Sequence, residues 1–185
     1  DELMLLALMS SENRAAATLS KVYPGGRKAF IAQMNAKAKA LGMKSTRFTD
    51  LSGLSDQNVS TARDLLRLVS AADSEPVIRR YTTQREVTVR VRGRPLQFVN
   101  TNRLVRNPND WDIGMQKTGF TNAAGRCLVM RATTAKRRLS MIFLDSVGTL
   151  TRFADAQRVR KQLEHQAKKR GGRPTKVANV QDTSP

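Results

Sequence analysis

The chain has 185 residues, which is long enough for one globular domain with a sizeable core. Its 33 Lys and Arg residues outnumber 15 Asp and Glu residues, giving a formal net charge of +18. Such a charge favours polyanionic partners: nucleic acid, an anionic membrane surface or a carboxylate-rich cell wall. One cysteine, Cys127, excludes an internal disulfide, and with His165 as the sole histidine we expect neither a metal site nor another cofactor.

Helices are expected throughout the first part of the chain. The apolar run at 3–9 is too short for a membrane span and lacks the basic leader of a signal peptide. A polar loop follows at 43–59, and Ser60 or Thr61 is expected to cap the next helix. That helix should bury Leu65, Leu66, Leu68 and Val69. The predicted helices cover residues 2–10, 12–21, 27–41, 61–72 and 76–81.

The hydrophobic period changes after residue 86. Val87, Val89 and Val91 alternate with Thr and Arg, which predicts a half-buried strand, and the sequence RGRP at 92–95 predicts the turn of a hairpin. A closing helix is expected to bury Phe153, Ala156, Val159 and Leu163. Segregated helices and strands favour an α+β domain with an antiparallel sheet, spanning 1–165, followed by a basic disordered tail at 166–185. The predicted strands are 87–91, 96–99, 114–121, 126–133 and 139–145.

Two short motifs are candidates for chemistry. Ser11-Glu12-Asn13 lies at the junction of two predicted helices, where a helix cap would explain it equally well. Lys117-Thr118-Gly119 lies on a predicted strand, where Lys and Gly could simply protect a sheet edge.

In this order the two motifs resemble Ser-x-Asn and Lys-Thr-Gly of the penicillin-binding protein and β-lactamase superfamily. The stretches LALMSSENRAA, STARDL, FVNTN and GMQKTGFTNAAGRCLV are similar to the D-alanyl-D-alanine carboxypeptidase family. Ser-Glu-Asn and the basic C-terminal extension most resemble its endopeptidase branch, typified by penicillin-binding protein 7. The resemblance implies a DD-peptidase-like transpeptidase fold, with a helical subdomain, an antiparallel sheet and a C-terminal helix.

The resemblance also implies roles for five residues. The hydroxyl of Ser11 would relay a proton during catalysis, and Asn13 would bind the substrate backbone. Lys117 would supply positive charge near the substrate carboxylate and Ser11. Thr118 would donate a hydrogen bond to the substrate, and Gly119 would let the peptide lie against the strand. The implied ligands are peptidoglycan stem peptides and β-lactams, and the implied location is the periplasm.

The nucleophile motif of this family, Ser-x-x-Lys, does not occur in the 185 residues. We therefore expect the chain to be an N-terminally truncated catalytic domain, which can bind but cannot acylate by itself. The function predicted by resemblance is that of a serine-type D-alanyl-D-alanine carboxypeptidase or endopeptidase that works through an acyl-enzyme.

Other functions remain open. A non-catalytic peptidoglycan-binding remnant would keep the Lys117 strand without the chemistry. A basic nucleic-acid-binding protein would use RGRP at 92–95 as a minor-groove hook, but its place between two strands favours a hairpin turn, and we expect no specific nucleic acid. The basic charge would allow electrostatic contact with an anionic cell wall or membrane surface. Cys127 is expected in the core, and Trp111 is expected to pin a loop.

Overall fold

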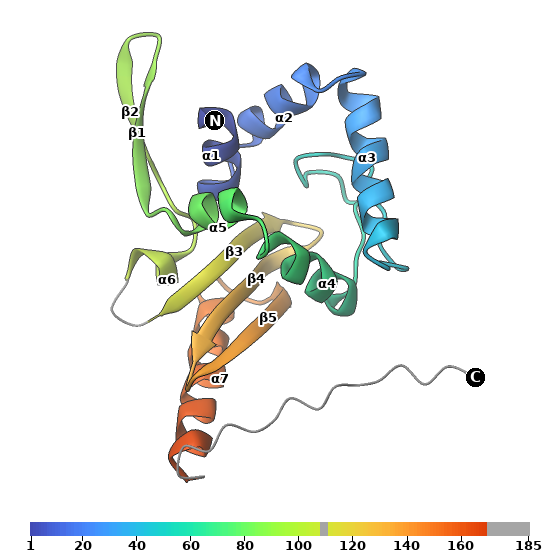
Figure 1. Ribbon diagram of the computed structural model, residues 1–185. Helices are drawn as coiled ribbons and strands as arrows, with labels where there is room; N and C mark the ends of the chain where they lie inside the picture. Colours follow the sequence, from blue (N-terminus) through green and yellow to red (C-terminus); the bar gives the residue numbers. More distant parts are fainter. Residues whose placement is uncertain (108–110, 170–185) are drawn as a thin grey trace, which may run out of the picture.

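The computed structural model describes residues 1–107 and 111–169. Helices form the first part of the chain, strands follow, and one long helix closes it, so the predicted α+β class is confirmed (Figure 1). In chain order the elements are α1 (Glu2–Met9), α2 (Asn13–Val22), α3 (Gly26–Ala40), α4 (Ala62–Ala72), α5 (Pro76–Thr83), β1 (Glu86–Val91), β2 (Arg94–Val99), α6 (Arg103–Arg106), β3 (Asp112–Thr121), β4 (Gly125–Thr134), β5 (Arg137–Ser146) and α7 (Thr151–Lys169).

The main sheet is antiparallel with the strand order β3-β4-β5. Helix α7 covers one face, and α4 and α5 pack against the other. On the α7 face, Leu128, Met130 and Ala132 of β4 meet Phe153 and Ala156 in the largest buried cluster. Because β3 pairs only with β4 in the described part of the chain, its other edge is open. This edge carries the Lys117-Thr118-Gly119 motif.

The β1–β2 hairpin stands at the side of α1 (Figure 1). Val87 and Val89 of β1 pack with Phe98 of β2 against apolar side chains of α1. Arg92 and Gly93 both adopt positive φ values, as a two-residue turn of this hand requires. The predicted hairpin is confirmed, with a turn of two residues in place of four.

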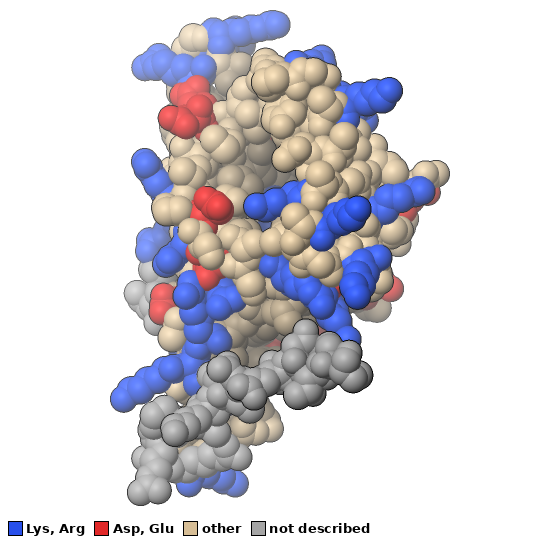
Figure 2. Space-filling model, turned by 45° about the vertical axis from the view of Figure 1, so that its right-hand side comes forward, with Lys and Arg blue, Asp and Glu red and all other residues tan. Residues whose placement is uncertain are grey.

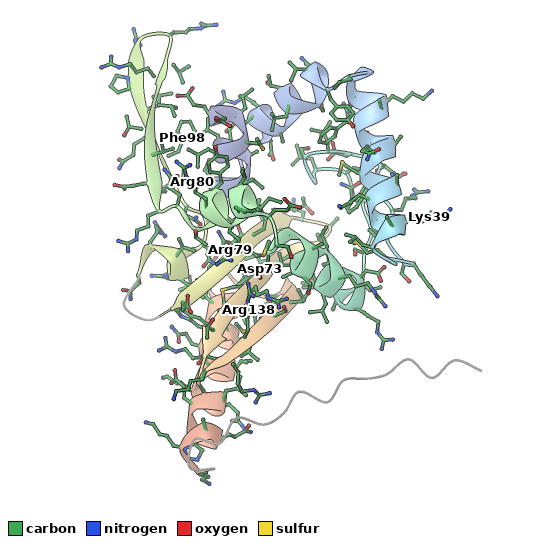
Figure 3. All side chains as sticks on the ribbon, viewed as in Figure 1. Lys39, Asp73, Arg79, Arg80, Phe98 and Arg138 are labelled. Atoms are coloured by element: carbon green, nitrogen blue, oxygen red, sulfur yellow. The ribbon has the colours of Figure 1, made fainter. Side chains whose placement is uncertain are left out.

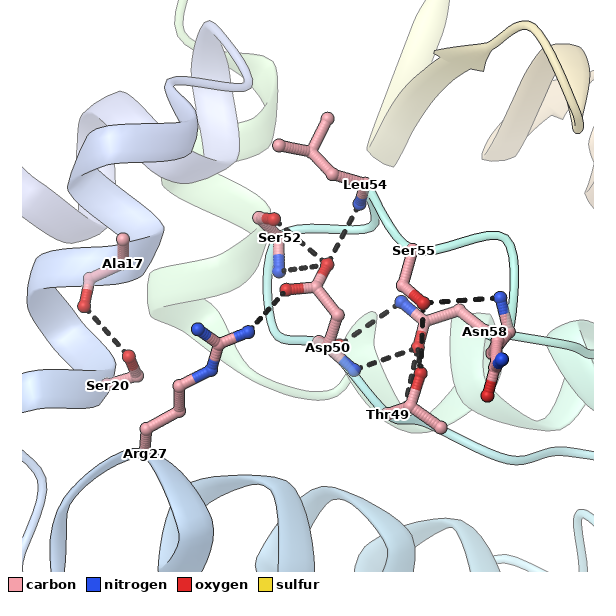
Figure 4. A network of polar contacts seen from close by, with 10 residues as sticks. Ala17, Ser20, Arg27, Thr49, Asp50, Ser52, Leu54, Ser55 and Asn58 are labelled. Atoms are coloured by element: carbon pink, nitrogen blue, oxygen red, sulfur yellow. Dashed lines mark hydrogen bonds and ion pairs between the residues drawn. The ribbon is translucent and has the colours of Figure 1, made fainter.

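The loop at 43–59 is ordered by buried carboxylates. Asp50 accepts hydrogen bonds from the backbone N–H groups of Ser52 and Leu54, at 3.1 and 2.8 Å, and lies 3.5 Å from Arg27 of α3 (Figure 4). Asp64 of α4 accepts from the N–H of Ser45 at 2.8 Å. The loop is therefore tied to α4 near its start and to α3 at its middle.

An ion cluster around the buried Asp73 joins the end of α4 to the sheet. Asp73 lies 3.1 Å from the Nε of Arg131 on β4 and also pairs with Arg138 of β5, toward which it points in Figure 3.

Figure 2 shows the basic side chains spread over the visible face, without a single basic stripe.

Several local predictions were wrong. Leu66 is 43% exposed, because that side of α4 faces away from the sheet, and Cys127 is only partly buried. Between the predicted strands 96–99 and 114–121, where no helix was predicted, the chain forms α6. Helix α7 continues to Lys169, so the start of the predicted tail is helical, and residues 170–185 lie outside the described part. Trp111, which was predicted to pin a loop, is buried in the core beside β3.

Candidate active site

Ser11 lies in a tight turn between α1 and α2. The carbonyl of Leu6 accepts hydrogen bonds from the N–H and the hydroxyl of Ser10, at 3.1 and 2.8 Å, and from the N–H of Glu12 at 3.2 Å. Between them Ser11 adopts φ 56°, in the left-handed region that non-glycine residues seldom occupy. Such backbone strain is often found at functional sites, where the surrounding contacts hold it in place.

Lys117 on β3 reaches the turn from the other side of the site. Its Nζ donates hydrogen bonds to the hydroxyl of Ser11 and to the carbonyl of Thr118, the latter at 3.0 Å. Burial lowers the pKa of Lys117 to about 8. The ammonium therefore predominates at neutral pH, but its proton can be released at a small cost in free energy.

Thr118 places its hydroxyl 2.6 Å from the hydroxyl of Thr101. The N–H of Thr101 in turn donates to the carbonyl of Met9, the last residue of α1, at 3.3 Å. Thr101 thus joins the strand of the Lys-Thr-Gly motif to the helix that precedes Ser11. The sequence analysis did not assign Thr101 to the site, although the stretch FVNTN that contains it contributed to the family resemblance.

A fully buried amide network holds β3 in place beside Thr101. The Nε2 of Gln116 donates to the carbonyl of Thr82 on α5 at 2.7 Å and to the Oδ1 of Asn100 at 3.0 Å. The Nδ2 of Asn100 donates to the carbonyls of Thr82 and Gln84, at 2.9 and 2.7 Å. All three side chains that make this network are about 1% exposed or less. Helix α5, the end of β2 and strand β3 are therefore fixed relative to one another.

The remaining two predicted site residues are exposed. Asn13 is the first residue of α2, with its side chain at the surface, and Gly119 lies on the open edge of β3. A Cβ at Gly119 would meet only the Cβ of Cys127, at 3.8 Å, which is an ordinary contact. The fold itself therefore does not require glycine at 119.

Together these residues present a hydroxyl, a partly buried amine and a strand edge that pairs with no other strand in the described part of the chain. An extended peptide could pair with such a strand, and the Lys117–Ser11 pair could pass a proton near it. Within residues 1–107 and 111–169, no three His, Cys, Asp or Glu side chains gather as metal ligands would. No helix in the same ranges has the length and apolar character needed to cross a bilayer.

Comparison with solved structures gives the class of protein. The chain is similar to penicillin-binding protein D2 of Listeria monocytogenes in its cefotaxime-bound form, with a TM-score of 0.75 and 32% identity, covering 86% of this chain and 64% of that one. It is also similar to the Streptomyces K15 DD-transpeptidase, with a TM-score of 0.78 and 27% identity over 86% of this chain and 65% of that one. The fold is that of the penicillin-binding proteins, as the sequence predicted.

Comparison of sequences gives the family. Residues 1–148 match the model of the D-alanyl-D-alanine carboxypeptidase family. The D-alanyl-D-alanine endopeptidases of Pseudomonas aeruginosa and Escherichia coli are each 53% identical over 165 residues, which cover 88% of this chain. The chain belongs to the D-alanyl-D-alanine carboxypeptidase family, which confirms the predicted resemblance. It spans about half, 53%, of the length of these two relatives.

Proposed function

We propose that the chain forms part of a serine-type D-alanyl-D-alanine carboxypeptidase or endopeptidase, which cleaves peptidoglycan peptides through an acyl-enzyme. The hydrogen bond from Lys117 to Ser11 is the observation that carries this proposal. It joins the Lys-Thr-Gly strand to the Ser-Glu-Asn turn, the two motifs that characterise the family. The 53% identity to endopeptidases favours the cleavage of cross-links over the trimming of free ends.

In this proposal the peptide lies along the open edge of β3, with Gly119 leaving room for its backbone. Thr118 donates a hydrogen bond to the peptide, and Asn13, exposed at the start of α2, binds its backbone from the opposite side. The Ser11 hydroxyl passes a proton to the departing amine, and the ammonium of Lys117 stabilises the negative charge that develops nearby.

The acylating serine must come from outside these 185 residues, because they contain no Ser-x-x-Lys. A protein that acts on peptidoglycan would work in the bacterial periplasm, and β-lactams would act as substrate analogues. The net charge of +18 would strengthen contact with the anionic cell wall.

Labelling with a fluorescent penicillin tests the proposal. A protein extended upstream of Asp1 through an encoded Ser-x-x-Lys should be labelled and should cleave cross-linked peptides, whereas the 185-residue chain alone should remain unlabelled. Ser11→Ala in the extended protein should strongly reduce both signals. An extended protein that is neither labelled nor active would refute the function. A labelled 185-residue chain would show that another nucleophile acts within it, and would contradict the assigned mechanism.

A further inference from the structure

The β1–β2 hairpin carries a strip of apolar side chains that α1 covers only in part. Successive residues of a strand alternate between its two faces, and the register places the strip on the face that packs against α1. The strip consists of Val87, Val89, Val91, Leu96 and Phe98. Val89 is buried against α1, whereas Val91 and Leu96, nearer the turn, are 44% and 45% exposed. In Figure 1 the hairpin extends past α1 on the side of its turn, beyond the helix that covers the rest of the strip.

Three arginines surround the exposed part of this strip. Arg90, Arg92 and Arg94 are all exposed and lie on or beside the turn, in the segment 90–96 that we call the hairpin end. The sequence from 87 to 99 contains no Asp or Glu. In the described part of the chain none of the three arginines forms an ion pair. The hairpin end is therefore both cationic and apolar.

The turn holds one of these arginines in a conformation that the backbone disfavours. Arg92 adopts φ 50° at the first of the two central positions, and Gly93 follows with φ 79°. Turns of this kind favour Asn, Asp or Gly at the first position, because the left-handed region crowds a larger side chain. A smaller residue would suit the turn better, so an arginine here is explained by a contact that the hairpin itself does not make.

An anionic lipid surface matches both properties of the hairpin end. Apolar side chains gain free energy at the boundary of the acyl chains, while guanidiniums stay at the level of the phosphates. An anionic polymer in water would pair with the arginines but would leave Val91 and Leu96 exposed. The minor groove of DNA, about 6 Å wide, accepts a single extended arm, whereas here the RGRP sequence is held between two paired strands.

We propose that the hairpin end docks on an anionic phospholipid surface. Val91 and Leu96 enter the interface, and Arg90, Arg92 and Arg94 contact headgroup phosphates. The docking is reversible and weakens with salt, because two partly exposed side chains bury little apolar area and the remaining attraction is electrostatic. This inference goes beyond the proposed function and does not depend on it.

Sedimentation with lipid vesicles tests the inference on the 185-residue chain. The net charge of +18 would draw any face toward anionic vesicles, so the deciding variants leave the charge unchanged. Val91→Ser combined with Leu96→Ser should weaken binding to vesicles of phosphatidylglycerol and phosphatidylcholine about tenfold. Val22→Ser combined with Leu54→Ser is the matched control, because it removes two apolar side chains that are even more exposed, 71% and 61%, and it should leave binding unchanged.

Removal of one charge gives a second comparison. Arg92→Gln should weaken binding about fivefold, since its charge lies at the lipid surface. Lys39→Gln removes an exposed lysine from α3, which Figure 3 shows well away from the hairpin, and should weaken binding by no more than about twofold.

A fluorescent reporter tests insertion directly. Leu96→Trp keeps the strip apolar, and its emission should shift to shorter wavelength with the anionic vesicles and be quenched by brominated lipid. Vesicles of phosphatidylcholine alone should produce neither change. Trp111 is buried in the core and supplies a constant background.

The inference would be overturned if the two serine pairs bound vesicles equally well, with unchanged thermal unfolding, or if Arg92→Gln and Lys39→Gln weakened binding equally. Unshifted emission of Leu96→Trp on anionic vesicles would also reject it, even if the serine variants proved unstable. Duplex DNA that binds more tightly than the vesicles, and whose binding is lost in Arg92→Gln but kept in the serine pair at 91 and 96, would assign the hairpin end to nucleic acid instead. None of these readouts involves penicillin labelling or peptide cleavage, so the proposed function is judged separately.

Discussion

Lys117 donates a hydrogen bond from its Nζ to the hydroxyl of Ser11, although 106 residues separate the two along the chain. Lys117 belongs to an edge strand, and Ser11 to a strained turn between two helices. The contact brings the two halves of the fold together at one point. Burial lowers the pKa of Lys117, so holding this lysine charged at the contact costs folding free energy, although the proposed chemistry needs the charge.

Replacing Lys117 by Met should stabilise the fold while removing its chemistry. A pKa of about 8 against 10.5 in the unfolded chain corresponds to a cost of about 3 kcal/mol below pH 8. About 2 kcal/mol is returned by the two hydrogen bonds to Ser11 and to the carbonyl of Thr118, so Lys117→Met should gain about 1 kcal/mol in the free energy of unfolding at pH 7. The unfolded state binds more protons between pH 8 and 10.5, so the gain should shrink as the pH rises through that window.

Urea unfolding at pH 7 and pH 10 measures this difference. Lys28→Met removes an exposed lysine from α3 and should show neither the gain nor its pH dependence. A Lys117→Met chain that is less stable than the original at pH 7 would show that burial of the ammonium is not a net cost.

Gly119→Ala should leave the fold intact but weaken peptide binding. A Cβ at 119 meets nothing closer than 3.8 Å, whereas an added strand would have to pass directly over it. Gly114→Ala, on the same strand, is the matched contrast, because its Cβ would lie 2.8 Å from the Oδ1 of Asp73. We expect thermal unfolding to be nearly unchanged for Gly119→Ala and lowered for Gly114→Ala. Unchanged peptide affinity in Gly119→Ala would contradict binding along this edge.

Thr101→Val should remove the hydrogen-bond partner of the Thr118 hydroxyl without changing the shape of the site. The two hydroxyls are 2.6 Å apart, and Thr118 is 9% exposed, so the lost partner should cost about 1 kcal/mol of stability. Peptide affinity should fall as well, because the Thr118 hydroxyl is no longer oriented. Thr88→Val, on the exposed face of β1, serves as the control and should affect neither quantity. If Thr101→Val bound the peptide with unchanged affinity, Thr101 would contribute to the stability of the fold and not to peptide binding.

Asp50→Asn should loosen the 43–59 loop in a pH-dependent manner. Burial alone would raise the pKa of Asp50, but hydrogen bonds from Ser52 and from backbone N–H groups including that of Leu54 hold it below its usual value. Because the pKa of Asp50 is lower in the folded chain, its carboxylate stabilises the fold when the pH is above the pKa of the unfolded chain, near 3.9. This stabilisation is lost as the pH falls through the pKa of the folded chain.

At pH 7 the variant should lose about 1–2 kcal/mol, and the difference from the unmodified chain should shrink below pH 4. Proteolysis within the loop and urea unfolding at several pH values measure both effects. Asp56→Asn, an exposed carboxylate in the same loop, is the control. A difference that does not change with pH would mean that the charge of Asp50 is not what orders the loop.

Much of the fold could be predicted because local patterns and tertiary packing agree. The alternating valines of β1 and the Thr61 cap of α4, whose hydroxyl accepts from the N–H of Asp64, both follow directly from short-range chemistry. Leu66 was wrongly predicted to be buried. The sequence of α4 shows that the helix has an apolar face, but it does not show how much of that face the neighbouring sheet covers. The extent of α7 was underestimated because its last turns are polar and make few apolar contacts.

The site itself was predicted only where a motif marked it. Ser11 and Lys117 were proposed from the family resemblance, and the structure brings the two side chains into direct contact. Thr101 was missed because nothing in its local sequence distinguishes it from any threonine after a strand. Its importance arises from a partner 17 residues away, and only the three-dimensional register shows that pairing.

The buried amides of Asn100 and Gln116 have a consequence for anyone who wishes to move this site to another scaffold. They tie the Thr82 carbonyl of α5, the exit of the β1–β2 hairpin and strand β3 into one rigid unit. A graft that carries β3 alone would leave the amide of Gln116 facing a foreign core without partners. The smallest portable module therefore contains these three separate segments together with the α1–α2 turn that carries Ser11, and homologous proteins should exchange them together or not at all.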